Sequence, residues 1–262
     1  MLSKLDHWLS PASDPARVAW LGQWTYAHRG LHGGPSGGGA IENSPAAFAA
    51  AIEAGLGLEC DVHRSADGRA IVFHDWELDR LTAEHGPLAS LTAGQLARVK
   101  LRSGESIPTL RDLLDRVGGG VPVLIELKTR RERPVAPLCR AVLRELEGYR
   151  GPHAVMGFDP RVGHWFAGHA PGTVRGLVVS EENARTLGGA AKRHFALWRA
   201  RPDFLAYDVR DLPSPFAAAQ RARGLPVVTW TVSGAASAQR SATYADASIA
   251  EGEGVAAALA RR

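Results

Sequence analysis

The chain has 262 residues, of which 45% are hydrophobic and 22% charged, close to the averages of soluble globular proteins. These proportions exclude a disordered chain, a fibrous repeat and a small disulfide-rich protein. Its 31 Lys and Arg residues against 27 Asp and Glu residues give a formal net charge of +4. This mild excess lacks the clustered basic patch that nucleic-acid binding requires, so we expect no nucleic-acid partner.

The two cysteines, Cys60 and Cys139, belong to no C-x-x-C pair, which excludes a zinc ribbon and a dithiol redox motif. We expect both to be buried thiols. The N-terminal residues lack a long apolar stretch, and no segment reaches the ~18 apolar residues of a membrane span. We therefore expect a cytoplasmic protein without a transmembrane segment.

Short apolar runs rich in β-forming residues alternate with helical patterns along almost the whole chain. The predicted strands are Thr25–His28, Leu58–Val62, Val123–Lys128, Ala154–Phe158, Gly176–Ser180, Phe204–Asp208, Val227–Val232 and Ala247–Ala250. The predicted helices are Ser44–Ala54, Leu110–Val117, Pro134–Glu147, Pro160–Ala167, Asn183–Arg199, Pro215–Arg223 and Gly252–Arg261. The first helix is the clearest, because Ser44 can cap it, Pro45 fits its first turn and Gly55 can end it.

One further strand, Ala70–His74, follows the second strand too closely for a helical crossover, because a parallel return needs a dozen or more residues. The intervening Asp67-Gly68 pair is a hairpin turn signal. We therefore interpret Val62–Arg64 and Ala70–Phe73 as an antiparallel hairpin that projects from the second strand.

The remaining eight strands, each in alternation with helices, predict a (β/α)8 TIM barrel with a small hairpin-containing insertion after the second strand. A doubly wound open sheet is the structural alternative. No linker divides the chain, so we expect a single domain over residues 1–262, with its core at about 24–260.

Polar residues follow or end the first three predicted barrel strands, and barrel active sites lie at these C-terminal strand ends. They are His28, Arg29, Glu59, Asp61, Glu126 and Lys128. The hairpin returns His74 and Asp75 toward the same edge. Residues two apart on a strand share one face, so we expect these side chains to converge on one rim.

Three carboxylates in a closed site need a compensating cation, and oxygen ligands suit Ca²⁺ or Mg²⁺. Zinc would require more His or Cys ligands. Arg29 and Lys128 add donors that match a phosphate group. The histidines His28 and His74 can act as general base and general acid near neutral pH. Together these groups predict the cleavage of a phosphodiester.

Seven segments occur in an order and spacing that resemble the glycerophosphodiester phosphodiesterase family. They are AHRG, IENS, LECDV, ADGRAIVFHD, IPTLRDLL, VLIELK and VVTWTV. The resemblance covers nearly everything from about Ala27 to the C-terminus. It implies a (β/α)8 barrel with a small insertion, a divalent metal, commonly Ca²⁺ or Mg²⁺, and hydrolysis of glycerophosphodiesters to glycerol 3-phosphate and an alcohol.

The resemblance further implies that His28 and His74 are the catalytic pair, although it does not fix which one is the base. It implies that Glu59, Asp61 and Glu126 bind the metal. The expected partner is therefore a small-molecule glycerophosphodiester, while the oligomeric state is left open.

The remaining implied residues surround this centre. Arg29 and Lys128 would contact the phosphate, and the Glu42-Asn43 pair would lie beside the metal as an extra ligand or a support. Two aromatic side chains would face the glycerol end, namely Trp230 and Phe158.

This chain departs from the family pattern in a Gly-rich stretch, GLHGGPSGGGA, over residues 30–40. It is interpreted either as a lid over the site or as a flexible surface insertion. Two alternative functions also stay open. One is a lysophospholipase D-type enzyme that acts on longer-chain lipids, and the other is a non-catalytic barrel that binds a phosphate ligand.

Overall fold

The computed structural model describes residues 2–33, 39–182 and 184–261. Its contacts divide the chain into two compact units, one made of residues 26–153 and the other of residues 1–25 together with 154–262. The expectation of a single domain over the whole chain stays a prediction.

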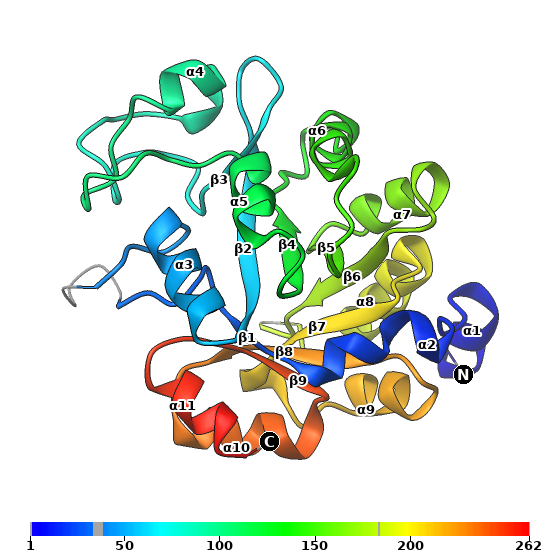
Figure 1. Cartoon of the computed structure of the whole chain (residues 1–262). Helices are drawn as coiled ribbons and strands as arrows, with labels where there is room; N and C mark the ends of the chain where they lie inside the picture. Colours follow the sequence, from blue (N-terminus) through cyan, green and yellow to red (C-terminus); the bar gives the residue numbers. More distant parts are fainter. Residues whose placement is uncertain (1, 34–38, 183, 262) are drawn as a thin grey trace. The chain divides into compact units, whose positions relative to one another are not determined.

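The unit of residues 26–153 holds three parallel strands and an antiparallel hairpin (Figure 1). β1 (Thr25–Ala27) pairs with β2 (Gly57–Arg64), which pairs in parallel with β4 (Val123–Leu127). β3 (Ala70–Val72) runs antiparallel to the end of β2, with Val62 opposite Val72. Its helices are α3 (Pro45–Glu53), η2 (Leu88–Ser90), α4 (Ala93–Leu96), α5 (Leu110–Val117) and α6 (Ala136–Leu146).

The other unit continues the alternation with strands that pair in parallel in chain order. The strands are β5 (His153–Gly157), β6 (Val174–Val179), β7 (Phe204–Asp208), β8 (Val227–Val232) and β9 (Ala247–Ala250). The helices are α1 (Leu2–Leu9), α2 (Pro15–Val18), η1 (Ala19–Gln23), α7 (Pro160–His169), α8 (Leu187–Ala200), η3 (Val209–Asp211), α9 (Pro215–Ala222), α10 (Ala235–Tyr244) and α11 (Glu253–Leu259).

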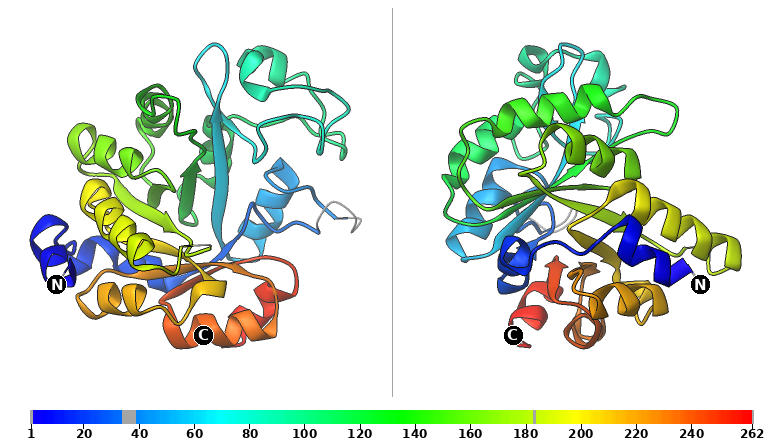
Figure 2. Two further views of the ribbon diagram at one scale, coloured as in Figure 1. Left: turned by 180° about the vertical axis from the view of Figure 1, so that it is seen from behind. Right: turned by 90° about the vertical axis from the view of Figure 1, so that its right-hand side faces the viewer.

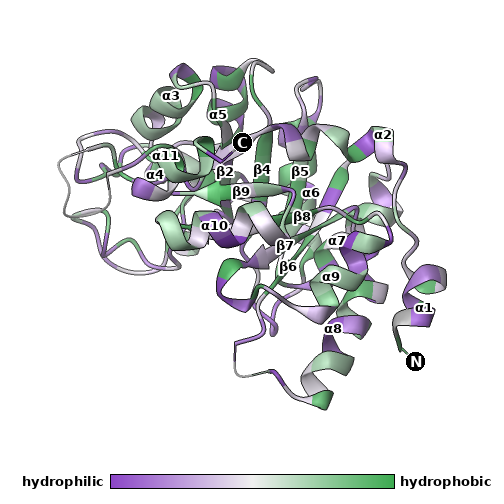
Figure 3. Ribbon diagram, turned by 90° about the horizontal axis from the view of Figure 1, so that it is seen from below, coloured by the Kyte–Doolittle hydropathy of each residue, from purple (hydrophilic) through white to green (hydrophobic). Residues whose placement is uncertain are grey.

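Eight parallel strands in alternation with helices, and one antiparallel strand outside the series, make the fold a (β/α)8 TIM barrel. This confirms the predicted fold class and the hairpin after the second strand. Most strand residues are apolar, and β4 and β9 are accordingly coloured mainly as hydrophobic in Figure 3, whereas α8 has both hydrophilic and hydrophobic turns. The alternative of a doubly wound open sheet is wrong.

Helix α3 begins and ends as its sequence predicts. The Ser44 hydroxyl accepts a hydrogen bond from the Ala47 N–H at 3.1 Å, and Pro45 occupies the first turn. Gly55 follows the helix with a φ of 68°, a conformation that glycine adopts without strain. The cap matters for the site, because it fixes the chain directly after Glu42 and Asn43.

The segment between β3 and α5 packs on its own apolar cluster rather than forming long helices. Phe73, Leu78, Leu81 and Ile107 are buried there together with neighbouring leucines. This cluster supports the loop that carries Asp75 and Arg80, and Figure 1 shows the loop with α4 beside the β2–β3 hairpin.

Helix α1 was not predicted from the sequence, yet it is firmly attached within its unit. Its Asp6 is fully buried and accepts hydrogen bonds from His194 and Trp198 of α8, each at 2.7 Å, and from Gln220 of α9, also at 2.7 Å. The two views of Figure 2 show α1 beside α8.

Two predicted segments lie partly outside the described residues. Helix α8 starts at Leu187 rather than at Asn183, because the Thr186 hydroxyl caps it by accepting from the Gly189 N–H at 3.1 Å; Asn183 itself lies outside the described residues. The Gly-rich stretch 30–40 includes residues 34–38, which also lie outside them, so its function as a lid stays a prediction. Within the described residues, no helix is both long and apolar enough to cross a membrane.

Candidate active site

Three buried carboxylates lie together on β2 and near the end of β4. Glu59 and Asp61 occupy alternate positions of β2, and Asp61 stands opposite Glu126 in the parallel register. One oxygen atom from each of the three side chains lies within 4.8 Å of those of the other two. The structure therefore brings together the carboxylates that the sequence singles out as a metal site.

Two cations contact this cluster. The Lys128 ammonium lies 2.9 Å from Asp61 Oδ1 and 2.9 Å from Glu126 Oε1. The Arg29 guanidinium lies 3.1 Å from Asp61 Oδ2. The backbone N–H of Arg29 donates to Glu59 Oε2 at 3.0 Å. Both cations, which the sequence assigns to a phosphate group, thus also balance the charge of the carboxylates.

A turn after β1 and a residue before α3 complete this arrangement. Arg29 and Asn43 have positive φ angles of 54° and 57°, and the Asn43 N–H donates to the Arg29 carbonyl at 2.8 Å. The Asn43 amide donates to Asp61 Oδ2 at 3.0 Å and accepts from the Asp61 N–H at 3.3 Å. Left-handed backbone at an arginine is uncommon and concentrates at functional sites.

His74 is held by a chain of charged groups at the end of the hairpin. Its Nδ1 lies 2.7 Å from Asp75 Oδ1, and Asp75 Oδ2 accepts from Arg80 Nε at 2.6 Å. The same Arg80 guanidinium donates to both oxygens of Glu42, at 2.7 and 2.8 Å, and Glu42 in turn accepts from Arg29 at 2.9 Å. With Asp75 ionised, Nδ1 carries the proton that Asp75 accepts, so Nε2 is the ring nitrogen that is not engaged with Asp75.

His28, the other predicted catalytic histidine, follows β1 and is mostly buried. Its Nε2 lies 4.0 Å from Glu59 Oε2. His28 is therefore placed directly beside the carboxylate cluster, in the same compact unit as His74.

The electrostatics of the cluster favour a bound cation. Burial and the nearby Asp61 raise the pKa of Glu59 to about 8, and burial also raises the pKa of Glu126 against the effect of Lys128. Burial opposes the ionisation of Asp61 too, but Lys128 and Arg29 hold its pKa well below the usual range. Lys128 and Arg29 therefore favour the ionised form of Asp61, whereas burial favours the neutral forms of Glu59 and Glu126.

An oxygen-only donor set fits a hard divalent cation. Three carboxylates with oxygens within 4.8 Å of one another offer the ligands that Ca²⁺ and Mg²⁺ prefer, and a cation held there would favour the ionised form of Glu59. The cluster can therefore hold a divalent metal ion.

The two predicted aromatic residues belong to the other unit. Phe158 directly follows β5 and is 49% exposed, and its ring meets that of Trp230 on β8 edge-on, with centroids 5.6 Å apart. The Trp230 indole N–H donates to the Ala206 carbonyl at 2.9 Å. Their contact with the glycerol end of a substrate stays a prediction.

Sequence reasoning missed three residues that organise the site. Arg80 lies in a segment without strand or helix periodicity, so no pattern linked it with Glu42, 38 positions earlier. Asp75 was noted at the strand end, but its support of His74 was not. His63 was not singled out as a site residue, yet its Nε2 lies 2.9 Å from the carbonyl of His74 and thus fixes the backbone there. The alternation Glu59, Asp61, His63 on β2 was the available signal.

Comparison with known proteins agrees with this fold. The model of the glycerophosphoryl diester phosphodiesterase family matches residues 28–249, so the chain belongs to that family, whose members generally bind a divalent metal. A Bacillus subtilis protein named as a glycerophosphodiester phosphodiesterase is 36% identical over 110 residues, which are 39% of this chain and 43% of that protein. The match thus spans less than half the length of this relative.

Solved structures show the same architecture. A glycerophosphodiester phosphodiesterase of Thermotoga maritima has a TM-score of 0.68 at 26% identity, over 86% of this chain and 93% of that one. A phosphodiesterase of Oleispira antarctica, solved in complex with the product sn-glycerol-3-phosphate, has a TM-score of 0.73 at 22% identity, over 87% and 92%. These likenesses confirm the TIM-barrel fold.

Proposed function

We propose that this protein is a metal-dependent glycerophosphodiester phosphodiesterase that releases glycerol 3-phosphate and an alcohol. The family match over residues 28–249 supports the reaction class. The observation that carries the proposal is the buried cluster of Glu59, Asp61 and Glu126 with two cations against it and a histidine within 4.0 Å. Phosphodiester hydrolysis uses these three kinds of group together.

The metal would be Ca²⁺ or Mg²⁺, held by Glu59, Asp61 and Glu126. When bound, it supplies a Lewis acid that polarises a phosphate oxygen. Asn43 orients Asp61 through its two hydrogen bonds, and Glu42 holds Arg29 in place. We therefore assign Glu42 and Asn43 to the support of the metal ligands.

The chain's own groups supply the proton transfers and the phosphate contacts. One histidine takes a proton from the nucleophile, which is water or the neighbouring glycerol hydroxyl, as the new O–P bond forms. Attack by water gives glycerol 3-phosphate directly, whereas attack by the glycerol hydroxyl first gives a cyclic phosphate, which water then opens to glycerol 3-phosphate. The other gives a proton to the alcohol oxygen as its bond to phosphorus breaks. Either His28 or His74 fits either role, and Asp75 orients His74. Arg29 and Lys128 stabilise the charge that develops on the phosphoryl oxygens.

The test is the release of glycerol 3-phosphate from glycerophosphocholine and glycerophosphoethanolamine, in EDTA and then with Ca²⁺, Mg²⁺ or Mn²⁺ added. We expect release only with metal, and we expect D61N to abolish it in every metal. The exposed Glu84 offers a matched control, since E84Q removes one acid away from the cluster. Full activity in EDTA would refute the metal requirement, and no release with any metal would refute the assigned reaction on these substrates.

A further inference from the structure

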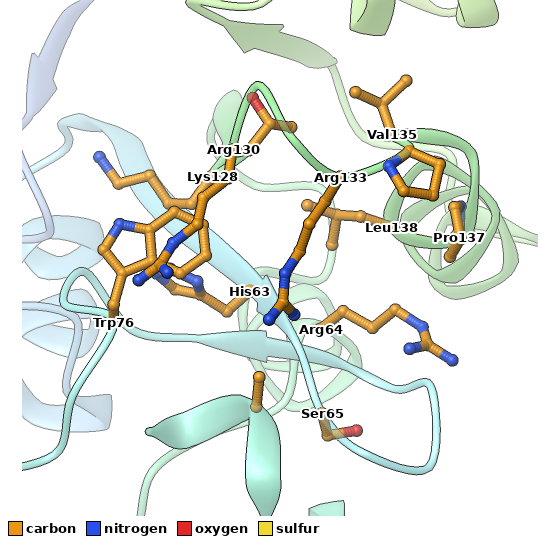
Figure 4. A pocket seen from close by; sticks show the side chains of 13 residues that line it. His63, Arg64, Ser65, Trp76, Lys128, Arg130, Arg133, Val135, Pro137 and Leu138 are labelled. Carbon is orange, nitrogen blue, oxygen red and sulfur yellow. The ribbon is translucent and has the colours of Figure 1, made fainter. Parts of the chain in front are cut away.

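A second feature of the same unit lies beyond the carboxylate cluster along β2. A cavity of about 270 Å³ opens between the β2–β3 hairpin and the loop that joins β4 to α6. Figure 4 shows Arg130 and Arg133 extending from that loop toward β2, with His63 and Trp76 on the opposite side. No step of the proposed reaction uses the arginines of this cavity.

The charge of the cavity is uniformly positive. Four cationic residues line it, namely Arg64, Lys128, Arg130 and Arg133. None of the described residues that line it is Asp or Glu. Lys128 faces Asp61 and Glu126, but Arg64 and Arg133 contact no carboxylate in the described part of the chain. Guanidinium groups without a carboxylate match a phosphate or a carboxylate of a ligand.

Aromatic and apolar side chains form much of the remaining wall. The Arg130 guanidinium stacks 4.3 Å above the Trp76 ring, whose edge meets the buried His63 ring with centroids 4.5 Å apart. Val135 and Leu138, both buried, close the side at α6. Such a mixture of apolar walls and a few convergent charged groups is typical of small-molecule sites.

The position of the cavity connects it with the catalytic groups. Glu59, Asp61 and His63 alternate along one face of β2, and two residues of a strand span roughly 7 Å. The Lys128 N–H donates to the Val62 carbonyl at 3.0 Å, so the start of the β4–α6 loop runs beside this stretch. A substituent on a phosphate held at the carboxylate cluster therefore needs only a few atoms to reach the cavity.

We propose that this cavity binds an additional anionic group on the alcohol part of the substrate. The enzyme then prefers glycerophosphodiesters whose leaving alcohol carries a phosphate or a carboxylate, and it disfavours a cationic head group such as choline. This inference rests on the proposed function, because it assigns the substrate class of the same site.

Two pairs of substrates that differ by one anionic group test the preference. The first is glycerophosphoinositol 4-phosphate against glycerophosphoinositol, and the second is glycerophosphoserine against glycerophosphoethanolamine. We expect kcat/KM to be about tenfold higher for the anionic member of at least one pair, as two partly exposed charge contacts would give. The double variant R64A/R133A should bring that ratio close to one.

A second double variant, R98A/R150A, removes the same charge from exposed positions of the unit outside the cavity, and it should keep the wild-type ratio. Equal kcat/KM values within both pairs, or a preference that survives R64A/R133A, would overturn the inference while leaving the proposed reaction intact. Hydrolysis of none of the four substrates with any metal would instead overturn the proposed function, and the inference with it.

Discussion

Asp61 is the residue on which the candidate site converges. It contacts Lys128 at 2.9 Å, Arg29 at 3.1 Å and Asn43 at 3.0 Å, and it shares its strand face with Glu59. Its neighbours keep it ionised while Glu59 favours its neutral form. Two carboxylates with pKa values driven apart by their surroundings are typical of functional sites. This supports a chemical function for the cluster rather than a purely structural one.

Substitution of the catalytic histidines is the most direct test at this scale. If His28 and His74 transfer protons, H28A and H74A should each lower kcat by about 100- to 10,000-fold. H85A is the matched control, because His85 is an exposed histidine of the same unit with a carboxylate partner, Asp79, at 2.7 Å. Near wild-type turnover in H28A or H74A, or a loss of only about tenfold, would contradict the mechanism.

His63 permits a prediction about stability and pH. It is 2% exposed, and burial lowers its pKa to about 4, whereas an unfolded chain gives about 6.5. The unfolded state therefore binds a proton between these values while the folded state does not. The stability that neutral His63 contributes is complete above pH 6.5 and is lost as the pH falls toward 4, by up to about 1.4 kcal/mol per pH unit.

Urea unfolding of the wild type and of H63Q in EDTA, at pH 7 and pH 5, measures this effect. The wild type should lose about 1–2 kcal/mol relative to H63Q over that interval. H85Q controls for the removal of an exposed histidine. A difference between wild type and H63Q that is the same at both pH values would show that His63 does not titrate as its burial requires.

At the scale of elements, the sequence predicted most of what positions the site. The limits of β7, β8, β9 and α5 agree with the predicted ranges, because apolar runs and caps are local signals. Helix α10 was missed, since it consists mainly of small and polar residues without an apolar stripe. Helix α1 was missed because its attachment depends on Asp6, whose partners lie about 190 and 214 positions later.

The contact between the turn after β1 and α3 is an element-level feature with a sharp test. Gly30 has a φ of 80°, and a Cβ there would lie 2.8 Å from the backbone and Cβ of Ala47. G30A should therefore destabilise the protein by about 2–4 kcal/mol, through a strained backbone and an overlap with the helix. Because the turn carries Arg29, activity should fall as well.

Gly86 is the matched control, since its φ is 93° and nothing lies within 4 Å of a Cβ there. G86A should show only the backbone strain, about 1 kcal/mol. Urea unfolding of the two variants separates the effect of backbone strain from that of the overlap with α3. Equal decreases in the free energy of unfolding for G30A and G86A would show that the overlap with α3 does not affect stability.

At the scale of the whole molecule, alternation of strands and helices is sufficient to predict a barrel, because all eight parallel strands carry their own local signal. The convergence of Glu59, Asp61 and Glu126 also followed, since the fold class places strand ends on one edge. The network from His74 through Asp75 and Arg80 could not be predicted, because it depends on how an irregular loop packs over its apolar cluster.

The link between metal binding and folding provides a test that does not depend on turnover. A ligand that binds only the folded state stabilises it, by about 2.7 kcal/mol at a concentration of 100 Kd. For a chain of this size, that corresponds to an increase of roughly 5–10 °C in Tm. We expect saturating Ca²⁺ or Mg²⁺ to produce such an increase in the wild type, because the ion would stabilise the charged forms of Glu59 and Glu126, whose pKa values burial raises.

The variants D61N and E126Q should remove most of this increase, because each deletes one oxygen charge of the cluster. E84Q, which changes an exposed acid of the same unit, should keep it. Thermal unfolding in EDTA and in added metal compares the four proteins directly. If D61N and E126Q both show the same increase in Tm as the wild type, the stabilising ion binds elsewhere in the chain. The absence of any increase in the wild type would contradict a metal site at Glu59, Asp61 and Glu126.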